Sequence, residues 1–187
     1  MKKYKILKDK PINIYGRTLY RIQAIRDFGK IKSGEIGGYI QSEKNLSQNG
    51  DCWIADNAMA YDESNIRDNA FLCGNAIAKG YATICGNACI EGNAVIKDHA
   101  TIYDYANLQD TCEVKDYCIV ASHAVISGNA KIRHSAYVGG FSYITDNAVV
   151  GGLAKLYGTI SVRGNAYVGG ITIRLRCHDI ANGFRII

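Results

Sequence analysis

Four basic residues recur every eighteen positions in the middle of the chain, and a set of ring-bearing residues keeps the same interval two positions later. The basic residues are Lys79, Lys97, Lys115 and Arg133, and the ring-bearing residues are Tyr81, His99 and Tyr117. Cations beside rings can hold phosphates, nucleotides or nucleic acid through charge and stacking. The alternative is a solvated basic stripe whose charge is relieved by Asp98 and Asp116.

The seven cysteines show no pattern typical of a metal site or of a disulfide framework. Their number is odd, and the pair Cys85 and Cys89 lacks the companion His or Cys pair that a zinc site needs. We therefore expect reduced cysteines and no metal. No run approaches the ~20 apolar residues of a membrane span. The basic start MKKYKILKDKP lacks the apolar core of a signal peptide, so we expect a cytoplasmic protein.

The net charge of +5 is unevenly distributed along the chain. Residues 1–50 contain eleven Lys and Arg and four acidic residues, a balance of +7, whereas residues 51–187 contain eleven and thirteen, a balance of −2. Attraction to polyanions would therefore begin at the amino-terminal segment. Tyr4, Tyr15, Tyr20 and Tyr39 lie among these basic residues, which makes nucleotide or nucleic-acid binding there a further alternative.

The elements that must position these side chains follow from a six-residue period. From Ile54 to Val168 every sixth residue is Ile, Leu or Val, except Ala60 and Ala78. A small residue follows four positions after each, with Ile160 as the exception. This period fits neither a helix nor an isolated strand, and it predicts a repeated strand and corner whose aliphatic and small residues point inward. Gly or Asp followed by Asn would form the corner, where Gly and Asn tolerate positive φ.

An eighteen-residue period divides the corners into three columns with different characters. One column is almost entirely Asn, a second changes from Asn to rings, and a third contains no Asn. The columns are Asn57, Asn75, Asn93, Thr111, Asn129, Asn147 and Asn165; then Asn69, Asn87, Tyr105, His123 and Phe141; then Glu63, Tyr81, His99, Tyr117, Ser135 and Leu153. Three hexads per coil explain this pattern, so we predict an all-β fold built of triangular coils.

The stretch Ile54-Ala-Asp-Asn-Ala58 and its successors resemble the hexapeptide repeat of left-handed parallel β-helix proteins. The resemblance implies a single-stranded left-handed parallel β-helix of about seven coils over residues 48–173. Residues 1–47 would form an amino-terminal β-hairpin cap, and residues 174–187 a carboxy-terminal cap or tail. The segments GRTLYRIQAIRDFG and GEIGGYIQSEKNLSQNG resemble the amino-terminal part of the YdcK-like branch, found in bacteria and phages.

A column of mostly apolar residues would face outward on the strands that carry the basic residues. Its apolar members suggest a covered surface, with scattered exposure as the alternative. We expect an interface with a partner or with copies of the chain, a trimer being favoured and a dimer possible, formed by Met59, Ile77, Val95, Val149 and Tyr167.

The resemblance also implies a catalytic alternative, because the superfamily includes trimeric acyltransferases that use acyl-coenzyme A and a histidine base. His99 and His123 are the candidates in this chain, and His134 and His178 are the remaining histidines. Such enzymes commonly interrupt a coil with a loop, and no insertion breaks the repeats here. A solvated corner histidine is the alternative reading for each candidate.

The uninterrupted repeat favours a non-catalytic scaffold that binds a macromolecular partner, most readily a protein, with no cofactor. The phage members of the resembled branch suggest an inhibitor of a host defence component as one such role. The acyltransferase with acyl-coenzyme A and the nucleotide or nucleic-acid binder are the two alternatives.

Overall fold

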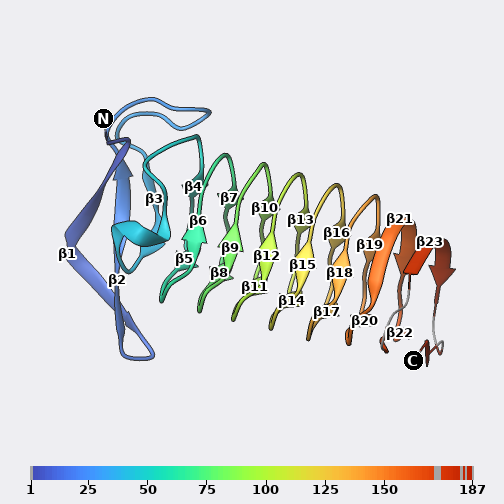
Figure 1. The fold of residues 1–187 in the computed structure, drawn as a ribbon. Coiled ribbons are helices and arrows are strands. Elements are labelled where there is room, and N and C mark those ends of the chain that lie inside the picture. The colour runs from blue at the N-terminus through green and yellow to red at the C-terminus, as the bar shows by residue number, and fades with distance from the viewer. Residues whose placement is uncertain (1, 171–173, 182, 184, 187) are drawn as a thin grey trace.

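The computed structural model describes residues 2–170, 174–181, 183 and 185–186. It is a rod in which short strands stack in parallel along three faces, with an antiparallel hairpin at the amino-terminal end (Figure 1). The predicted left-handed parallel β-helix with a hairpin cap is therefore confirmed. Among the described residues, no helix is long and apolar enough to cross a bilayer.

Each face of the rod is named here by its first strand. The β4 face contains β4 (Trp53–Ile54), β7 (Phe71–Leu72), β10 (Cys89–Ile90), β13 (Asn107–Leu108), β16 (Val125–Ile126) and β19 (Tyr143–Ile144). The β5 face contains β5 (Met59–Ala60), β8 (Ile77–Ala78), β11 (Val95–Ile96), β14 (Glu113–Val114), β17 (Lys131–Ile132), β20 (Val149–Val150), β22 (Tyr167–Val168) and β24 (Arg185–Ile186). The β6 face contains β6 (Asn65–Ile66), β9 (Thr83–Ile84), β12 (Thr101–Ile102), β15 (Ile119–Val120) and β18 (Tyr137–Val138).

Parallel pairing extends beyond residues 48–173 at both ends. β3 (Ile36–Ile40) pairs with β5, and Leu46 bridges Ile66. At the other end β21 (Lys155–Val162) runs along both the β6 and β4 faces and pairs with β23 (Arg174–Ile180). β24 pairs with β22, so eight parallel strands follow one another on the β5 face from β5 onward. The strands β23 and β24 thus continue the parallel stack into the segment for which a carboxy-terminal cap or tail was predicted.

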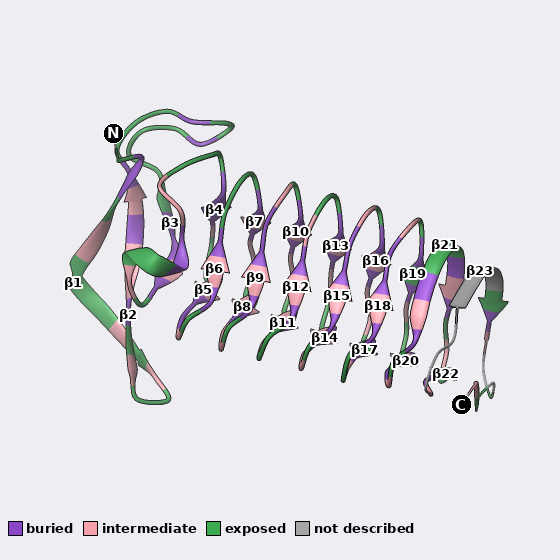
Figure 2. Cartoon of the chain, in the orientation of Figure 1, coloured by how far each residue is buried: buried purple, intermediate pink, exposed green. Residues whose placement is uncertain are grey.

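The inward positions form one continuous apolar core along the rod. The six-residue aliphatic series and the small residues between its members are fully buried, and Figure 2 shows buried residues at the same place on each coil. Cys52, Cys112 and Cys118 replace Ala in this core, and all three are free thiols. Ile160, the exception to the small-residue series, is buried within the continuous strand β21.

The corners differ from the prediction in which residue adopts positive φ. It is the residue before each corner residue, which is Gly or Asp in most coils, such as Asp104 at φ 59 and Gly128 at φ 64, and Ser122 or His134 in two others. The predicted role for Asn was therefore wrong. Asp reaches this left-handed region more readily than most residues. Its carboxylate also accepts the backbone N–H one coil further on, at 3.1 Å from Ser122 to Asp104 and 2.9 Å from Gly128 to Asp110.

The Asn column instead forms rows of hydrogen-bonded side chains between coils. The Asn75 amide donates to the Asn93 amide oxygen at 3.1 Å, and Asn129 donates to Asn147 at the same distance. The eighteen-residue spacing places these amides directly above one another, so each interior amide can both donate and accept.

The cap consists of β1 (Tyr4–Ile14) and β2 (Arg17–Ala24), and it packs on the first coil through aromatic contacts. The rings of Phe28 and Tyr4 meet the Trp53 ring edge to face, at centroid distances of 5.5 and 6.4 Å. Lys3 is fully buried, and its ammonium donates to the carbonyl oxygens of Gly50 at 3.0 Å and Cys52 at 2.9 Å. Part of the basic character at this end therefore serves the junction between cap and rod.

Candidate functional site

The predicted basic column lies along one edge of the β5 face, directly after β8, β11, β14 and β17. Its charge is partly compensated. The Lys97 ammonium lies 2.6 Å from the Glu113 carboxylate on the next coil, and each side chain is less than a third exposed. The hydrogen bond that Lys97 donates to Glu113 raises the pKa of Lys97. Burial raises the pKa of Glu113, but the hydrogen bond from Lys97 and the positive charges of Lys97, Lys115 and Lys131 together outweigh it, so this pKa is lowered.

Two more carboxylates lie between the basic column and the rings. Asp98 accepts the backbone N–H of Asp116 at 3.3 Å, and Asp116 accepts that of His134 at 2.7 Å. These groups hold the corner and relieve the positive charge beside it. The geometry thus favours the locally neutralised stripe over a strongly basic binding surface. Lys79 and Lys115 remain without an ion-pair partner among the residues that the structure describes.

The predicted rings are brought together as a stack. The ring centroids of Tyr81, His99 and Tyr117 are 4.8 Å apart at interplanar angles of 0° and 4°. A second stack, which was predicted only as a corner column, joins Tyr105, His123 and Phe141 at centroid distances of 5.0 and 4.9 Å. Because the ring faces cover one another, mainly ring edges and Tyr hydroxyls face outward. These two stacks are called the ladders below.

Each catalytic candidate is the middle rung of a ladder. His99 and His123 are exposed, and each imidazole lies between two aromatic rings. His134 has φ 67 and accepts the Gly152 N–H on Nδ1 at 3.2 Å, so it serves the corner. The side chain of His178 lies outside the described residues. In the described part of the chain, no three His, Cys, Asp or Glu side chains come together as a metal site would require.

The predicted interface column lies on the β5 face, and its members are half-buried. Charged residues interrupt it, because Glu113 and Lys131 follow Val95 in register on β14 and β17. At its end Tyr167 is contacted by Arg133, whose guanidinium carbon lies 5.9 Å from the ring centroid. It stays a prediction that this column contacts a partner or another copy of the chain.

The sequence analysis missed the β6 face, which lies between the two ladders. Its outward residues on four successive coils carry no charge; they are Thr83, Cys85, Thr101, Tyr103, Ile119, Ala121, Tyr137 and Gly139. The ladders border it with large exposed rings, of which Tyr117 is 65% exposed and Phe141 56%. Reading the eighteen-residue columns on this face, as was done for the basic column, would have revealed it.

A row of tyrosines runs up the middle of the β6 face. The Tyr103 and Tyr137 side chains are hydrogen-bonded, and the rings of Tyr137 and Tyr157 lie 4.9 Å apart. Burial raises the pKa of Tyr137, and Tyr103 raises it further. A Cβ at Gly139 would lie 2.7 Å from the Tyr137 hydroxyl oxygen, so a larger residue there would displace the Tyr137 ring. The row is therefore a packed surface of the rod.

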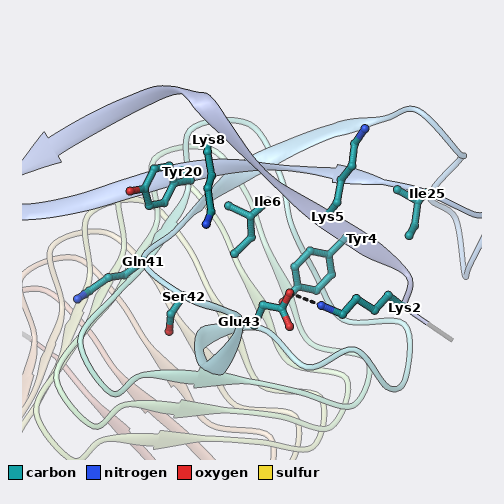
Figure 3. Close-up of a pocket in the computed structure, with 10 residues that line it drawn as sticks. All are labelled: Lys2, Tyr4, Lys5, Ile6, Lys8, Tyr20, Ile25, Gln41, Ser42 and Glu43. Carbon is teal, nitrogen blue, oxygen red and sulfur yellow. Dashed lines mark hydrogen bonds and ion pairs between the residues drawn. The ribbon is translucent and has the colours of Figure 1, made fainter.

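The cap tyrosines do not form one surface. Tyr4 is buried, and its hydroxyl donates to the Leu46 carbonyl at 2.6 Å; burial raises its pKa. The Tyr39 ring is covered by the Arg21 guanidinium at 4.3 Å. Tyr15 is exposed at the hairpin turn, whereas Tyr20 lines a groove on the cap (Figure 3).

Comparison with known proteins gives one partial match. No family model matches the chain. A segment of 57 residues is 42% identical to a protein of Escherichia coli (strain K12) named uncharacterized acetyltransferase YdcK. The fold and this match fit the hexapeptide-repeat β-helix superfamily. The segment covers 30% of this chain and only 18% of that relative.

Proposed function

We propose that the chain is a binding scaffold that engages a partner protein through the β6 face and its two ladders. The observation that carries the proposal is a flat surface without charge on four coils, bordered by exposed rings. Protein interfaces have cores depleted in charged residues and enriched in aromatic residues, with a polar rim. The residues Lys79 and Lys115, just past the Tyr81 ladder, would belong to that rim.

The ladders favour a polypeptide over a nucleic acid on this face. Bases bind single-strand proteins by stacking on free ring faces, and here neighbouring rings already cover most of those faces. Phosphates also need cations, and the eight outward residues of the face supply none. The exposed ring edges and tyrosine hydroxyls suit apolar side chains and backbone carbonyls.

The proposal is tested by adding one charge to the face. Ile119→Arg places a cation at the centre of the β6 face, and Val125→Arg makes the same change at a half-buried outward position of the β4 face. Quantitative affinity purification from the source cells should recover one partner with the wild type and with Val125→Arg, but not with Ile119→Arg. Equal recovery with all three proteins would exclude the β6 face as the docking surface.

The basic column has a separate test. Replacing Lys79, Lys97, Lys115 and Arg133 together with Glu should weaken partner binding only moderately if these residues form a rim. Complete loss would move the centre of the interface to the β5 face. Unchanged binding would remove the column from the interface.

We further propose that the apolar column of the β5 face mediates self-association, with a trimer favoured. The Ile77→Arg variant should have a lower sedimentation coefficient than the wild type, because it disrupts the assembly. The Val125→Arg variant should sediment like the wild type. A wild type that sediments as a monomer at all concentrations would contradict this proposal. The proposed role of the β6 face would be unaffected.

Acetyl transfer is the second candidate, because the matched relative is named an acetyltransferase. His99 or His123 would then act as general base on a substrate, with acetyl-coenzyme A as donor. His99→Phe and His123→Phe retain a ring in each ladder and remove the base. Titration calorimetry should show acetyl-coenzyme A binding, and one Phe variant should lose coenzyme A release without losing stability. Absence of binding at millimolar concentration would exclude this candidate.

A further inference from the structure

The cap contains a groove of about 480 Å³, separate from the three faces of the rod. Strand β1 provides Ile6 and Lys8, β2 provides Tyr20, and the segment before η1 (Glu43–Asn45) provides Gln41 and Ser42. Its volume lies in the range of small-molecule sites. Figure 3 shows Ile6 and Lys8 directed from β1 toward the segment that carries Ser42, with Tyr20 and Gln41 at the edge of the groove.

Regular alternation along β1 directs Lys8 into this groove together with Tyr4 and Ile6, and an irregularity beyond it turns Lys10 away. β1 and β2 pair regularly from Tyr4 to Leu7, and the register then shifts before Ile12. Strict alternation would place Lys8 and Lys10 on the same side of the strand. They line different grooves instead, since Lys10 lies with Arg21 on the opposite side of the sheet. Bulges of this kind often redirect a side chain next to a functional site.

The groove presents hydrogen-bond donors and excess positive charge. Lys2, Lys5 and Lys8 line it with a single carboxylate, Glu43, which the Lys2 ammonium already neutralises at 2.6 Å. Within the described chain, the Lys8 ammonium and the Tyr20 hydroxyl have no hydrogen-bond partner. Figure 3 shows the Lys8 ammonium directed toward the Ser42 side of the groove, whereas Lys5 extends away from it. The site is thus arranged for an anion near Lys8.

Apolar groups complete the lining. Ile6 is half-buried and Ile25 exposed, and the Tyr20 ring is half-buried at the edge of the groove. The combination of an uncompensated ammonium, a hydroxyl and an apolar wall fits a ligand with a phosphate at one end and a planar group at the other. We propose that the cap groove binds a nucleoside monophosphate, either free or as the phosphorylated end of a strand.

The test uses AMP as probe and one matched pair of variants. Lys8→Gln removes the charge in the groove, and Lys10→Gln removes an identical charge on the opposite side of the same hairpin. Loss of a charge-assisted hydrogen bond should weaken AMP binding by about tenfold or more in Lys8→Gln. Lys10→Gln should bind within about twofold of the wild type, and adenosine, which lacks the phosphate, should bind at least about tenfold more weakly than AMP. Calorimetry measures AMP binding to the wild type and to the two variants, and adenosine binding to the wild type.

A second pair of probes distinguishes the two sources of the phosphate. If a short single-stranded DNA with a 5′-phosphate binds more tightly than AMP, and if its binding depends on Lys8, the site recognises strand ends. AMP binding without this preference would assign it to free nucleotides. The proposal is overturned if neither probe binds, if AMP and adenosine bind equally, or if Lys8→Gln and Lys10→Gln have the same effect.

Discussion

At the scale of single residues, the stack depends on side chains that tolerate an unusual backbone conformation and also link coils. Asp104 has φ 59, and its carboxylate accepts the Ser122 N–H at 3.1 Å. Most residues with a Cβ resist this conformation by roughly 1–2 kcal/mol. Asp reduces this cost and satisfies a backbone donor in the next coil, which explains why Asp alternates with Gly at this position.

Asp104 therefore allows a test of both contributions. Asp104→Ala should destabilise the protein by about 2–3 kcal/mol, because it loses the hydrogen bond and raises the conformational cost. Asp104→Asn should cost less than half as much, since Asn retains an acceptor and the same tolerance of positive φ. Urea unfolding followed by circular dichroism measures the difference. Equal stability of the two variants would contradict this account of the corner.

At the scale of elements, the ladders and the ion pair tie successive coils together outside the core. Parallel strands lie ~4.8 Å apart, a distance at which stacked rings on neighbouring coils contact each other. The ring centroids of Tyr81 and His99 are 4.8 Å apart for this reason. The same spacing places the Glu113 carboxylate beside the Lys97 ammonium, which relieves the repulsion between the stacked positive charges.

His99 should contribute to stability mainly as a ring. His99→Ala removes two ring contacts and should lower the free energy of unfolding by about 1–2 kcal/mol. His99→Phe should remain within about 0.5 kcal/mol of the wild type, because the stack is preserved. Thermal and urea unfolding test both changes. If Phe is as destabilising as Ala, an imidazole-specific interaction must hold the ladder.

The Lys97–Glu113 pair predicts a pH dependence. The pKa of Glu113 is lowered from its ordinary 4.5, so its stabilising effect is present above that value and is lost as the pH falls through the folded-state pKa. The pKa of Lys97 is raised from 10.5, so its part is lost only in more alkaline solution. The stability advantage of the wild type over Glu113→Gln should disappear on acidification below pH 4.5. A constant advantage down to pH 2 would exclude the ion pair as its source.

At the scale of the whole molecule, the rod is a one-dimensional stack in which each coil pairs only with its neighbours. Its stability is then a sum of coil terms and contacts between coils. A defect in the core should be transmitted to the adjacent coils, whereas a change on the surface should remain local.

Ile102 and Ile119 provide a matched pair for this prediction, because they occupy inward and outward positions on β12 and β15. Ile102→Ala leaves a cavity in the core and should cost about 2–5 kcal/mol, with faster amide exchange in the coils on both sides. Ile119→Ala should cost less than about 1 kcal/mol and leave exchange unchanged. Hydrogen exchange measured by mass spectrometry tests the contrast. Identical exchange in both variants would contradict the one-dimensional account.

The coil and the identity of its columns could be predicted from the order of the residues alone. The periods of six and eighteen fix which residues point inward and which lie above one another, since a parallel stack without insertions leaves no other register. The positions of Lys97, His99 and Tyr117 along one edge could therefore be predicted. The Asn residues were recognised as a column, but their hydrogen bonds and the positive φ of Asp were not predicted.

The contacts that the columns and the cap make could be seen only in the folded chain. Whether Lys97 is free or paired depends on the side-chain conformations that bring its ammonium to 2.6 Å from the Glu113 carboxylate one coil away. The cap groove depends on contacts between segments some forty residues apart, such as Lys2 and Glu43. A repeat encodes its own neighbours at a fixed spacing, whereas irregular and long-range contacts carry no such signal in the sequence.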